Sequence, residues 1–257
     1  MVKLASWNVN SLKVRLDQVL EWLVSFNVDV LALQETKLID EQFPVQAFTD
    51  LGYTVAFSGQ KTYNGVAIVS RTPIENVLTD LPHWDDPQRR ILAANVAGVR
   101  LINLYVPNGF APGSDKYDYK LTWLRNVTVF IQQQLQQYSK VAVVGDFNIA
   151  PSDSDVHDPK AWEGCVLVSE PERQAFNQLI TLGLKDSFRE AMPEKQQFSW
   201  WDYRAAGFRR NLGLRIDHIL LNDLLNQDCS EVGVDVEPRR AERPSDHAPV
   251  WVSLNLH

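Results

Sequence analysis

The organisation of this chain is clearest in residues 141–148, which read Val-Ala-Val-Val-Gly-Asp-Phe-Asn. Four apolar residues that favour β-structure lead into Gly145, and the acid Asp146 and the amide Asn148 follow at once. A short apolar run bounded by Gly, Asn or Asp is typical of a strand that is buried on both faces. The segment therefore predicts a buried strand that ends in polar side chains.

Similar runs recur along the whole chain. They predict further strands at residues 4–8, 28–33, 54–57, 66–70, 91–96, 100–105, 215–221, 232–236 and 248–254. Amphipathic stretches predict helices at residues 12–26 and 117–138, and a third helix after the capping box at residues 169–172. We expect Asn10 or Ser11 to cap the first helix and Asn27 to end it, and Gly183 to end the third.

No repeat, linker or low-complexity block divides the sequence, so we expect one α/β domain over residues 1–257. Its alternating strands and helices favour two sheets with helices on the outside. A single open parallel sheet is the alternative architecture, although so many strands would make it unusually wide.

Composition excludes several classes of protein. With 45% hydrophobic and 22% charged residues among 257, the chain is an ordinary globular protein and not a disordered or collagen-like one. The net charge of −7 argues against a broad basic surface. Two isolated cysteines, Cys165 and Cys229, argue against a disulfide framework or a thiolate zinc site. Without a signal-peptide pattern or a long apolar run, we expect a cytoplasmic protein with no membrane contact.

Several predicted strands carry acids, amides or a histidine at one end. These residues are Asn8, Asn10, Glu35, Asp146, Asn148, Asp246 and His247, and Asp217 lies inside a strand. Each of them alone is more simply a turn residue, since Asn, Asp and Gly commonly end strands. That explanation fits Glu35 and Asp217 poorly, because Glu is a poor turn former and an acid in an apolar strand must be paired. His247 is a possible partner for Asp217.

The types of residue in this set indicate metal-assisted chemistry. Carboxylates and amides with one histidine and no thiolate suit Mg²⁺ or Mn²⁺, whereas zinc usually takes more His or Cys ligands. Phosphodiester hydrolysis needs an activated water, a positive group at the phosphate and stabilisation of the leaving oxygen. Asp146, His247 and a metal ion at Glu35 are of the right types to supply all three.

Six motifs, taken together, resemble the exonuclease III family of abasic-site (AP) endonucleases within the endonuclease/exonuclease/phosphatase superfamily. In chain order they are WNVNS (7–11), LQETK (33–37), YVPNG (105–109), GDFN (145–148), GLRID (213–217) and SDHAP (245–249). Each motif alone is weak, but six in this order, from Leu4 to Val252, are specific. The resemblance implies a four-layer α/β sandwich, in which two mixed β-sheets pack face to face with helices on the outside.

The resemblance also implies roles for these residues. Glu35 resembles the principal ligand of Mg²⁺, which Mn²⁺ can replace, and three other residues resemble its neighbours in the metal region: Asn8, Asn10 and Asp246. Asp146 matches the residue that activates or positions the attacking water, and Asn148 helps to orient that water. His247, held by Asp217, resembles the charged donor to the scissile phosphate. Two further phosphate or leaving-group contacts are Tyr105 and Asn108.

Substrate selection has its own candidates. Trp200, Leu214 and Ile216 resemble an apolar pocket that receives a flipped-out abasic sugar, where an attached base would clash. Trp201 is as readily a core residue, and it would point away from Trp200 in a strand. Basic residues that can follow a DNA backbone lie in loops beside strand ends: Lys61, Arg89, Arg90, Arg204, Arg209, Arg210, Arg239 and Arg240.

The expected activity is that of a monomeric, Mg²⁺-dependent DNA repair nuclease with no obligate protein partner. It would cleave duplex DNA 5′ to abasic sites, trim phosphates and phosphodiesters from 3′ ends, and act as a 3′ to 5′ exonuclease in base-excision repair. Residues 110–120 and 158–168 align with no motif, so the balance of these activities stays open. The alternatives are a phosphodiesterase for phosphoinositides or sphingomyelin, and a DNA-binding module without activity. The latter should have lost Glu35, Asp146, Asp217 or His247.

Overall fold

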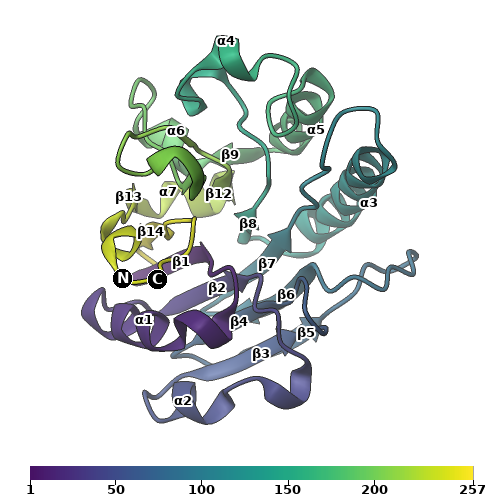
Figure 1. Cartoon of the computed structure of the whole chain (residues 1–257). Helices are drawn as coiled ribbons and strands as arrows, with labels where there is room; N and C mark the ends of the chain where they lie inside the picture. The colour runs from purple at the N-terminus through teal and green to yellow at the C-terminus, as the bar shows by residue number, and fades with distance from the viewer. Residues whose placement is uncertain (257) are drawn as a thin grey trace.

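The computed structural model describes residues 1–256, which form two six-stranded sheets packed face to face (Figure 1). The first sheet has the order β13 (Cys229–Val234), β14 (Val250–Leu254), β1 (Val2–Asn8), β2 (Val30–Gln34), β4 (Val66–Ser70) and β3 (Thr54–Ser58). The second has the order β5 (Ile74–Leu78), β6 (Ile91–Val96), β7 (Val99–Tyr105), β8 (Val141–Asp146), β12 (Asp217–Asn222) and β9 (Leu184–Asp186). Both sheets are mixed, because β1 with β2 and β7 with β8 are parallel pairs among antiparallel ones.

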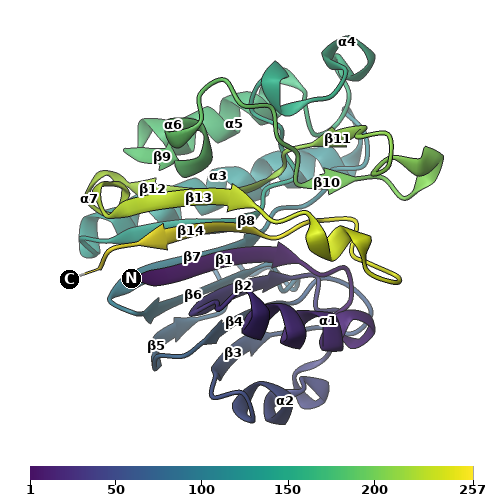
Figure 2. The ribbon, with the colours of Figure 1, turned by 90° about the vertical axis from the view of Figure 1, so that its left-hand side faces the viewer.

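Helices cover the outer faces of the two sheets. Helices α1 (Leu12–Ser25) and α2 (Val45–Thr49) lie on one side of the molecule, and α3 (Asp115–Gln137) and α5 (Glu170–Thr181) lie on the other (Figures 1 and 2). Shorter elements join the layers: α4 (Pro159–Trp162), α6 (Ser187–Ala191), α7 (Asp223–Gln227), the 3₁₀ turns η1 (Asp40–Gln42), η2 (Asp153–Asp155), η3 (Arg204–Ala206) and η4 (Glu237–Arg240), and the ribbon of β10 (Trp200–Trp201) and β11 (Gly213–Leu214). The expected four-layer sandwich is confirmed, and the single open sheet is wrong. Within residues 1–256, no helix is both long and apolar enough to span a bilayer.

Three apolar layers explain why the strands read as continuous hydrophobic runs. One layer lies between the sheets and includes Val144 of β8. A second lies between the second sheet and helices α3 and α5, and includes Val143. A third lies between the first sheet and α1. Neighbouring residues of β8 thus face different layers, and both are completely buried. A strand covered on both faces has no polar side to alternate with.

The helix ends agree in part with the expected caps. The capping box of Ser169 and Glu172 is formed at the start of α5, and Asn27 (φ 52°) and Gly183 (φ 98°) follow helices in the left-handed region. Ser11, one of the two expected residues, occupies the N-cap position of α1, but its side chain makes no capping hydrogen bond. Instead, the backbone N–H groups of Ser11 and Leu12 donate to carbonyls of the loop after β2. The start of α1 is therefore joined to the residues around Glu35.

A buried polar link joins the two sheets beneath that loop. Gln34 at the end of β2 donates from Nε2 to Asn103 Oδ1 of β7, 2.8 Å away, and to Ser6 Oγ at 3.0 Å. Asn103 Nδ2 in turn donates to the carbonyl oxygens of Leu33 and Ala67. Because buried polar groups are costly when unpaired, this network favours one relative placement of the sheets.

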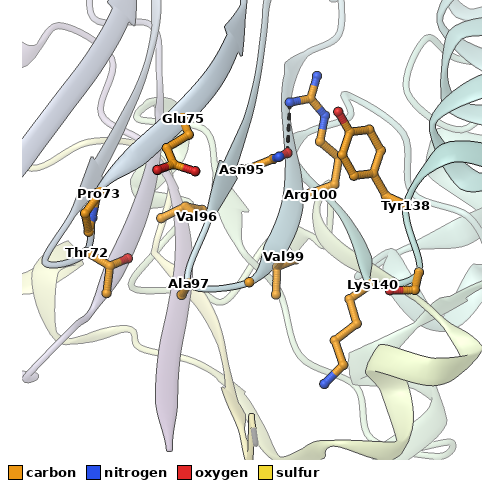
Figure 3. A pocket seen from close by; sticks show the side chains of 12 residues that line it. Thr72, Pro73, Glu75, Asn95, Val96, Ala97, Val99, Arg100, Tyr138 and Lys140 are labelled. Carbon is orange, nitrogen blue, oxygen red and sulfur yellow. Dashed lines mark hydrogen bonds between the residues drawn. The ribbon is translucent and has the colours of Figure 1, made fainter.

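A cleft of about 420 Å³ lies at the other end of β7, beside the β6–β7 turn (Figure 3). Arg100 is buried at its wall and donates to Gln134 Oε1 at 2.7 Å, to the Asn76 carbonyl at 2.8 Å and to Asn95 Oδ1 at 3.2 Å. The guanidinium thus joins α3 to strands β5 and β6. We regard this cleft as a structural joint, because Tyr105 and the polar strand ends lie at the opposite end of the strand.

A buried ionic network joins β12 to the loops that precede it. Arg215 is only 2% exposed, and it donates to Asp155 Oδ1 and Asp186 Oδ2, each at 2.7 Å. Its Nη1 also donates to His218 Nδ1, so His218 donates from Nε2 to the Ile149 carbonyl at 2.9 Å. Burial alone would raise the pKa of Asp155, but the charge and hydrogen bonds of Arg215 outweigh burial and lower this pKa to about 2.

This network predicts an acid-sensitive contribution to stability. The unfolded-state pKa of Asp is about 3.9, so the contribution of Asp155 is present above pH about 4 and is lost as pH falls through the folded-state value of about 2. We expect Asp155→Asn to lower the free energy of unfolding by about 2 kcal/mol at pH 7. Urea unfolding from pH 7 to pH 2.5 should show the wild-type and variant stabilities converging. A constant difference across this range would contradict the assignment.

Candidate active site

The pairing of strands places several polar residues side by side. In the second sheet Asp146 is paired with Tyr105 of β7 and with Asp217 of β12. In the first sheet Asn8 ends β1 beside Gln34, and Glu35 follows directly. His247 lies in the segment before β14 and forms an isolated bridge with Trp200. The residues predicted from all six motifs thus meet where the ends of the two sheets come together.

Asn8 bridges the two sheets at this point. Its Nδ2 donates to Glu35 Oε1 and to Asp146 Oδ2, each 2.9 Å away. Its Oδ1 accepts from the backbone N–H of Asn10. Asn8 therefore offers N–H groups, and not its oxygen, to the acids. In this arrangement Asn8 orients both carboxylates, and its expected place in the metal region stays a prediction.

Asp217 and His247 form a buried ion pair. His247 donates from Nδ1 to Asp217 Oδ2 at 2.9 Å, and Ser199 Oγ donates to the same carboxylate at 2.6 Å. The other ring nitrogen, Nε2, lies 3.7 Å from Asp146 Oδ2. Burial alone would lower the pKa of His247, but the charges of Asp217 and Asp146 outweigh burial and raise this pKa to about 10. His247 is therefore a cation at neutral pH.

Asp146 is a buried acid with no cation of residues 1–256 in close hydrogen-bonding contact, since His247 Nε2 is 3.7 Å from its Oδ2. Burial raises its pKa to about 7, although the charge of His247 and hydrogen bonds from Asn8 and Asn148 oppose the rise. The backbone N–H of Asn148 donates to Asp146 Oδ1 at 2.9 Å. A carboxylate with a pKa near neutrality is suited to accept and return a proton. Asp146 can therefore serve as a general base at this site.

The group around Glu35 fits a hard cation. The Lys37 ammonium lies 3.0 Å from Glu35 Oε2 and 2.5 Å from Asn10 Oδ1, so the structure already places a positive group between these oxygens. Asn10 Nδ2 donates to Asp246 Oδ1, and Trp200 Nε1 donates to Asp246 Oδ2, each at 2.9 Å. Carboxylate and amide oxygens of this kind are ligands of Mg²⁺ and Mn²⁺. Glu35, Asn10 and Asp246 thus offer oxygens of the type that such a cation would take.

A second group of possible ligands adjoins the first. Asp146, Asp217 and His247 offer ligand atoms that lie within 4.8 Å of one another. Both oxygens of Asp217 already contact His247 Nδ1, and one of them also accepts from Ser199. A metal ion here would have to break that buried pair. Asp146 is therefore the member of this group that is best placed to turn toward an ion beside Glu35.

Non-glycine residues in the left-handed region gather at the site. They are Asn10 (φ 43°), Ser11 (φ 94°), Glu35 (φ 53°), Lys37 (φ 55°) and Asn148 (φ 50°). This conformation costs roughly 1–2 kcal/mol for a residue with a Cβ atom, so surrounding contacts must hold it. Backbone hydrogen bonds do so here, for example from Ser11 N to the Glu35 carbonyl and from Lys37 N to the Asn64 carbonyl. Strain of this kind concentrates at functional sites.

Tyr105, Asn108 and Asn148 line the side of the site formed by the second sheet. Asn108 Nδ2 donates to Asn148 Oδ1 at 3.2 Å, and Asn148 Nδ2 donates to the Val106 carbonyl at 2.9 Å. Burial and the nearby carboxylate of Glu35 raise the pKa of Tyr105 well above its usual value. Its hydroxyl therefore stays protonated and can donate a hydrogen bond.

The aromatic wall differs from the expected pocket. Trp200 is partly exposed, but Leu214 and Ile216 are almost completely buried and lie behind it as packing, so they do not line an open pocket directly. Trp201 is a core residue. Trp162 at the end of α4 is a residue that the sequence reading missed, and its ring packs edge-on against Trp200 with 6.5 Å between ring centroids. The segment of α4 aligned with no motif, so its tryptophan gave no signal.

The predicted basic residues are not equally available. Lys61 is exposed, whereas Arg90 donates to Gln88 Oε1 at 2.7 Å and stacks over Tyr105, with 4.6 Å to the ring centroid. Arg239 is only 6% exposed and lies against Phe208, which contradicts its expected place on the surface. An arginine between aromatic rings packs through its planar guanidinium as well as its charge. Arg239 also donates to the Ser245 carbonyl, so it supports the loop that carries Asp246 from within.

Comparison with known proteins gives concordant results. A family model described as "Endonuclease/Exonuclease/phosphatase family" matches residues 5–247. Exodeoxyribonuclease III of Haemophilus influenzae is 35% identical over 267 residues, covering 98% of this chain and all of the relative. A structure of the 3′ phosphatase NExo from Neisseria, bound to a product DNA hairpin, is 47% identical with a TM-score of 0.98, and both chains are fully covered.

An AP endonuclease structure from Archaeoglobus fulgidus is 38% identical with a TM-score of 0.96, again with full coverage of both chains. These likenesses extend over the whole length that carries the six motifs, and they accompany an acid, amide and histidine cluster gathered from both sheets. The chain therefore belongs to the endonuclease/exonuclease/phosphatase family, in its branch of exonuclease III-type AP endonucleases, and is a phosphodiester-hydrolysing enzyme.

Proposed function

We propose that this enzyme is a Mg²⁺-dependent nuclease of DNA base-excision repair that acts on duplex DNA. It cleaves 5′ to abasic sites, removes phosphate and phosphodiester groups from blocked 3′ ends, and degrades DNA from 3′ to 5′. The observation that carries this proposal is the placement of Asp146 between the His247–Asp217 pair and the Glu35 group. Relatives described as a 3′ phosphatase, a 3′-5′ exonuclease and an AP endonuclease support it.

All three activities break the same kind of bond, which is why one site can serve them. In each case water attacks phosphorus and the bond to the 3′ oxygen breaks, so the DNA strand is left with a 3′ hydroxyl. Asp146 accepts the proton of the attacking water, and the Asn148 side chain helps to hold that water. The charged His247 donates to a phosphate oxygen and stabilises the negative charge that grows there. The Tyr105 hydroxyl is placed to donate to another oxygen of the phosphate.

The metal ion belongs beside Glu35 in this proposal, with Asn10 and Asp246. Mg²⁺ supplies positive charge that stabilises the transferred phosphate and the leaving oxygen, and Mn²⁺ can replace it. Asn8 orients Glu35 and Asp146 by donating to both. Trp200, supported by the buried Leu214 and Ile216, forms an apolar wall next to Asp246 for the sugar at the cleaved position.

We also propose that residues 1–257 act as one monomeric domain. Strand β1 near the N-terminus pairs with β14 near the C-terminus, so the two ends of the chain belong to one sheet. The silent DNA-binding alternative is disfavoured, because Glu35, Asp146, Asp217 and His247 are all retained. A lipid phosphodiesterase is disfavoured by the DNA-acting relatives at 35–47% identity.

The substrate assignment can be tested with one series of labelled duplexes. The series carries an abasic site, a 3′ phosphate, a 3′ phosphoglycolate, a nick or a recessed 3′ end, and each is incubated with Mg²⁺ or with EDTA. We expect products with 3′ hydroxyl ends in Mg²⁺ and intact substrates in EDTA, because the proposed ion stabilises the charged phosphate. Intact abasic and 3′-blocked duplexes in Mg²⁺ would refute the proposal, and hydrolysis of sphingomyelin alone would favour the lipid alternative.

Asp146→Asn and His247→Asn should separate catalysis from binding. Both residues act on charge and protons that move during the reaction, so we expect turnover to fall by about 10³-fold or more while the Kd for duplex DNA changes by less than about threefold. Single-turnover kinetics and fluorescence anisotropy give the two quantities. Parallel losses of turnover and affinity would mean that these residues mainly bind the substrate.

Glu35→Gln should weaken the metal site without changing the fold. Loss of one negative ligand is expected to raise the Mg²⁺ concentration for half-maximal activity, and the Kd for Mn²⁺ measured by calorimetry, by about tenfold or more. Glu75→Gln is the matched control, because Glu75 is an exposed glutamate on β5. Unchanged Mn²⁺ binding in Glu35→Gln would place the ion elsewhere, with the Asp146 group as the next candidate.

A further inference from the structure

Lys120 is a completely buried lysine close to the site. It lies on α3, and its side chain is 0% exposed. Its ammonium donates to the Asn148 carbonyl at 2.6 Å, to the Asn108 carbonyl at 3.2 Å and to the carboxylate of Glu172, which is also 0% exposed. The reaction described above does not use this group, so its burial needs another explanation.

Stability alone explains this pair poorly. Taking two charges out of water is expensive, and well-packed apolar residues of similar size are often at least as stabilising as a buried ion pair. Burial lowers the pKa of Lys120, while the charge of Glu172 opposes that shift. In some proteins a buried ionic or polar group specifies one arrangement of the groups around it. The partners of Lys120 show which arrangement that is.

The two carbonyls that Lys120 holds belong to two asparagines of the site. Asn108 and Asn148 contact each other, and the backbone N–H of Asn148 donates to Asp146. Asn148 adopts φ 50°, a conformation that needs external support. The stem of Lys120 also lies against the turn at Gly109, where an added Cβ atom would be 3.0 Å from Lys120 Cδ. One ammonium thus fixes the backbone of both loops.

Glu172 connects this arrangement to α5. Its Oε1 accepts from the backbone N–H of Leu167, and its Oε2 accepts from the backbone N–H of Ser169 in the capping box. The Tyr117 hydroxyl of α3 is 2.5 Å from Ser169 Oγ. The carboxylate of Glu172 is therefore held by the segment that follows α4. The ammonium of Lys120 in turn connects α3 to α5 and to the loops of Asn108 and Asn148.

We propose that Lys120, neutralised by Glu172, is a positioning residue that sets Asn148 and Asn108 in their catalytic geometry and, through the backbone of Asn148, the orientation of Asp146. The inference rests on the proposed nuclease function, which it deepens. Lys120 touches no substrate group and acts through the two asparagines. Loss of Lys120 should therefore lower turnover only through Asn108 and Asn148, including the effect of the Asn148 backbone on Asp146.

A double-mutant cycle with Asn148→Ala tests this directly. Lys120→Met is combined with Glu172→Gln, so that no unpaired charge is left buried, and Gln can still accept in the capping box. Turnover of a duplex with a 3′ phosphate is measured under saturating conditions and expressed per folded enzyme, from circular dichroism and a thermal melt. We expect the Lys120→Met, Glu172→Gln variant to lose at least about tenfold in kcat in the wild-type background. The loss should be clearly smaller in the Asn148→Ala background, where only the routes through the backbone of residue 148 and through Asn108 remain.

The control is another ion pair that ties two segments together. Lys140 and Asp228 are 2.6 Å apart at the opposite end of β8 from Asp146, and Lys140→Met with Asp228→Asn should leave kcat unchanged. Equal fold-losses for the Lys120 and Glu172 change in both backgrounds, or wild-type turnover of that variant, would overturn the inference. If the Lys120→Met, Glu172→Gln variant does not fold, Lys120→Gln with Glu172→Gln takes its place in the cycle, because the Gln side chain keeps an N–H donor at position 120.

A measurement that does not depend on enzyme activity distinguishes the positioning role of Lys120 from the proposed nuclease function. The backbone amide ¹H and ¹⁵N shifts of Asn148 should move in the Lys120→Met, Glu172→Gln variant and stay in place in the Lys140→Met, Asp228→Asn variant. If the wild type leaves all DNA substrates intact while this shift occurs, the proposed function fails and the positioning role stands. Unmoved Asn148 resonances would overturn the positioning role whatever the activity.

Discussion

Two carboxylates from different sheets share the amide group of Asn8, and the rest of the site depends on that contact. Glu35 follows β2 of the first sheet and Asp146 ends β8 of the second, yet both accept from the same nitrogen at 2.9 Å. This is possible only while the sheets are packed face to face with these strand ends level. The apolar layer between the sheets and the Gln34–Asn103 link beneath the site are therefore conditions for the chemistry as well as for stability.

The buried charges around the site are nearly all matched at close range. Asp217 contacts His247, Glu172 contacts Lys120, and Asp155 contacts Arg215, each through a hydrogen-bonded pair. Asp146 is different, because its neighbours are amides and a histidine ring nitrogen 3.7 Å away. Burial without a close cation disfavours its charged form, which is the physical origin of its raised pKa. The acid that we propose as the general base is thus the one whose charge is incompletely compensated by its neighbours.

The sequence predicted the strands better than the contacts between distant side chains. The bounds of β4 and β6 match the prediction, since these apolar runs begin and end at turn residues, but β12 begins at Asp217 because Arg215 turns into the ionic network. Strands β9 to β11 have only two or three residues, too few for a periodic pattern. Lys120 and Glu172 are 52 positions apart, and Trp162 and Trp200 are 38 apart, so no local spacing indicates that they meet. The motifs predicted which residues lie close together. They did not predict that Asn8 would donate through its side-chain nitrogen, or that Leu214 would be buried behind Trp200.

The ammonium of Lys37 between Glu35 and Asn10 has a consequence for how an ion would enter this site. Glu35 is already paired with the ammonium of Lys37, so a divalent ion that bound there would replace one positive charge with two. The net affinity of such an ion would be its attraction to these oxygens minus the attraction of Lys37 that it displaces. The change in local charge on binding would therefore be small. Lys37, displaced from Glu35, would remain beside the site because it is only two residues away in the sequence. Its ammonium would then be free to contact a phosphate of the DNA backbone.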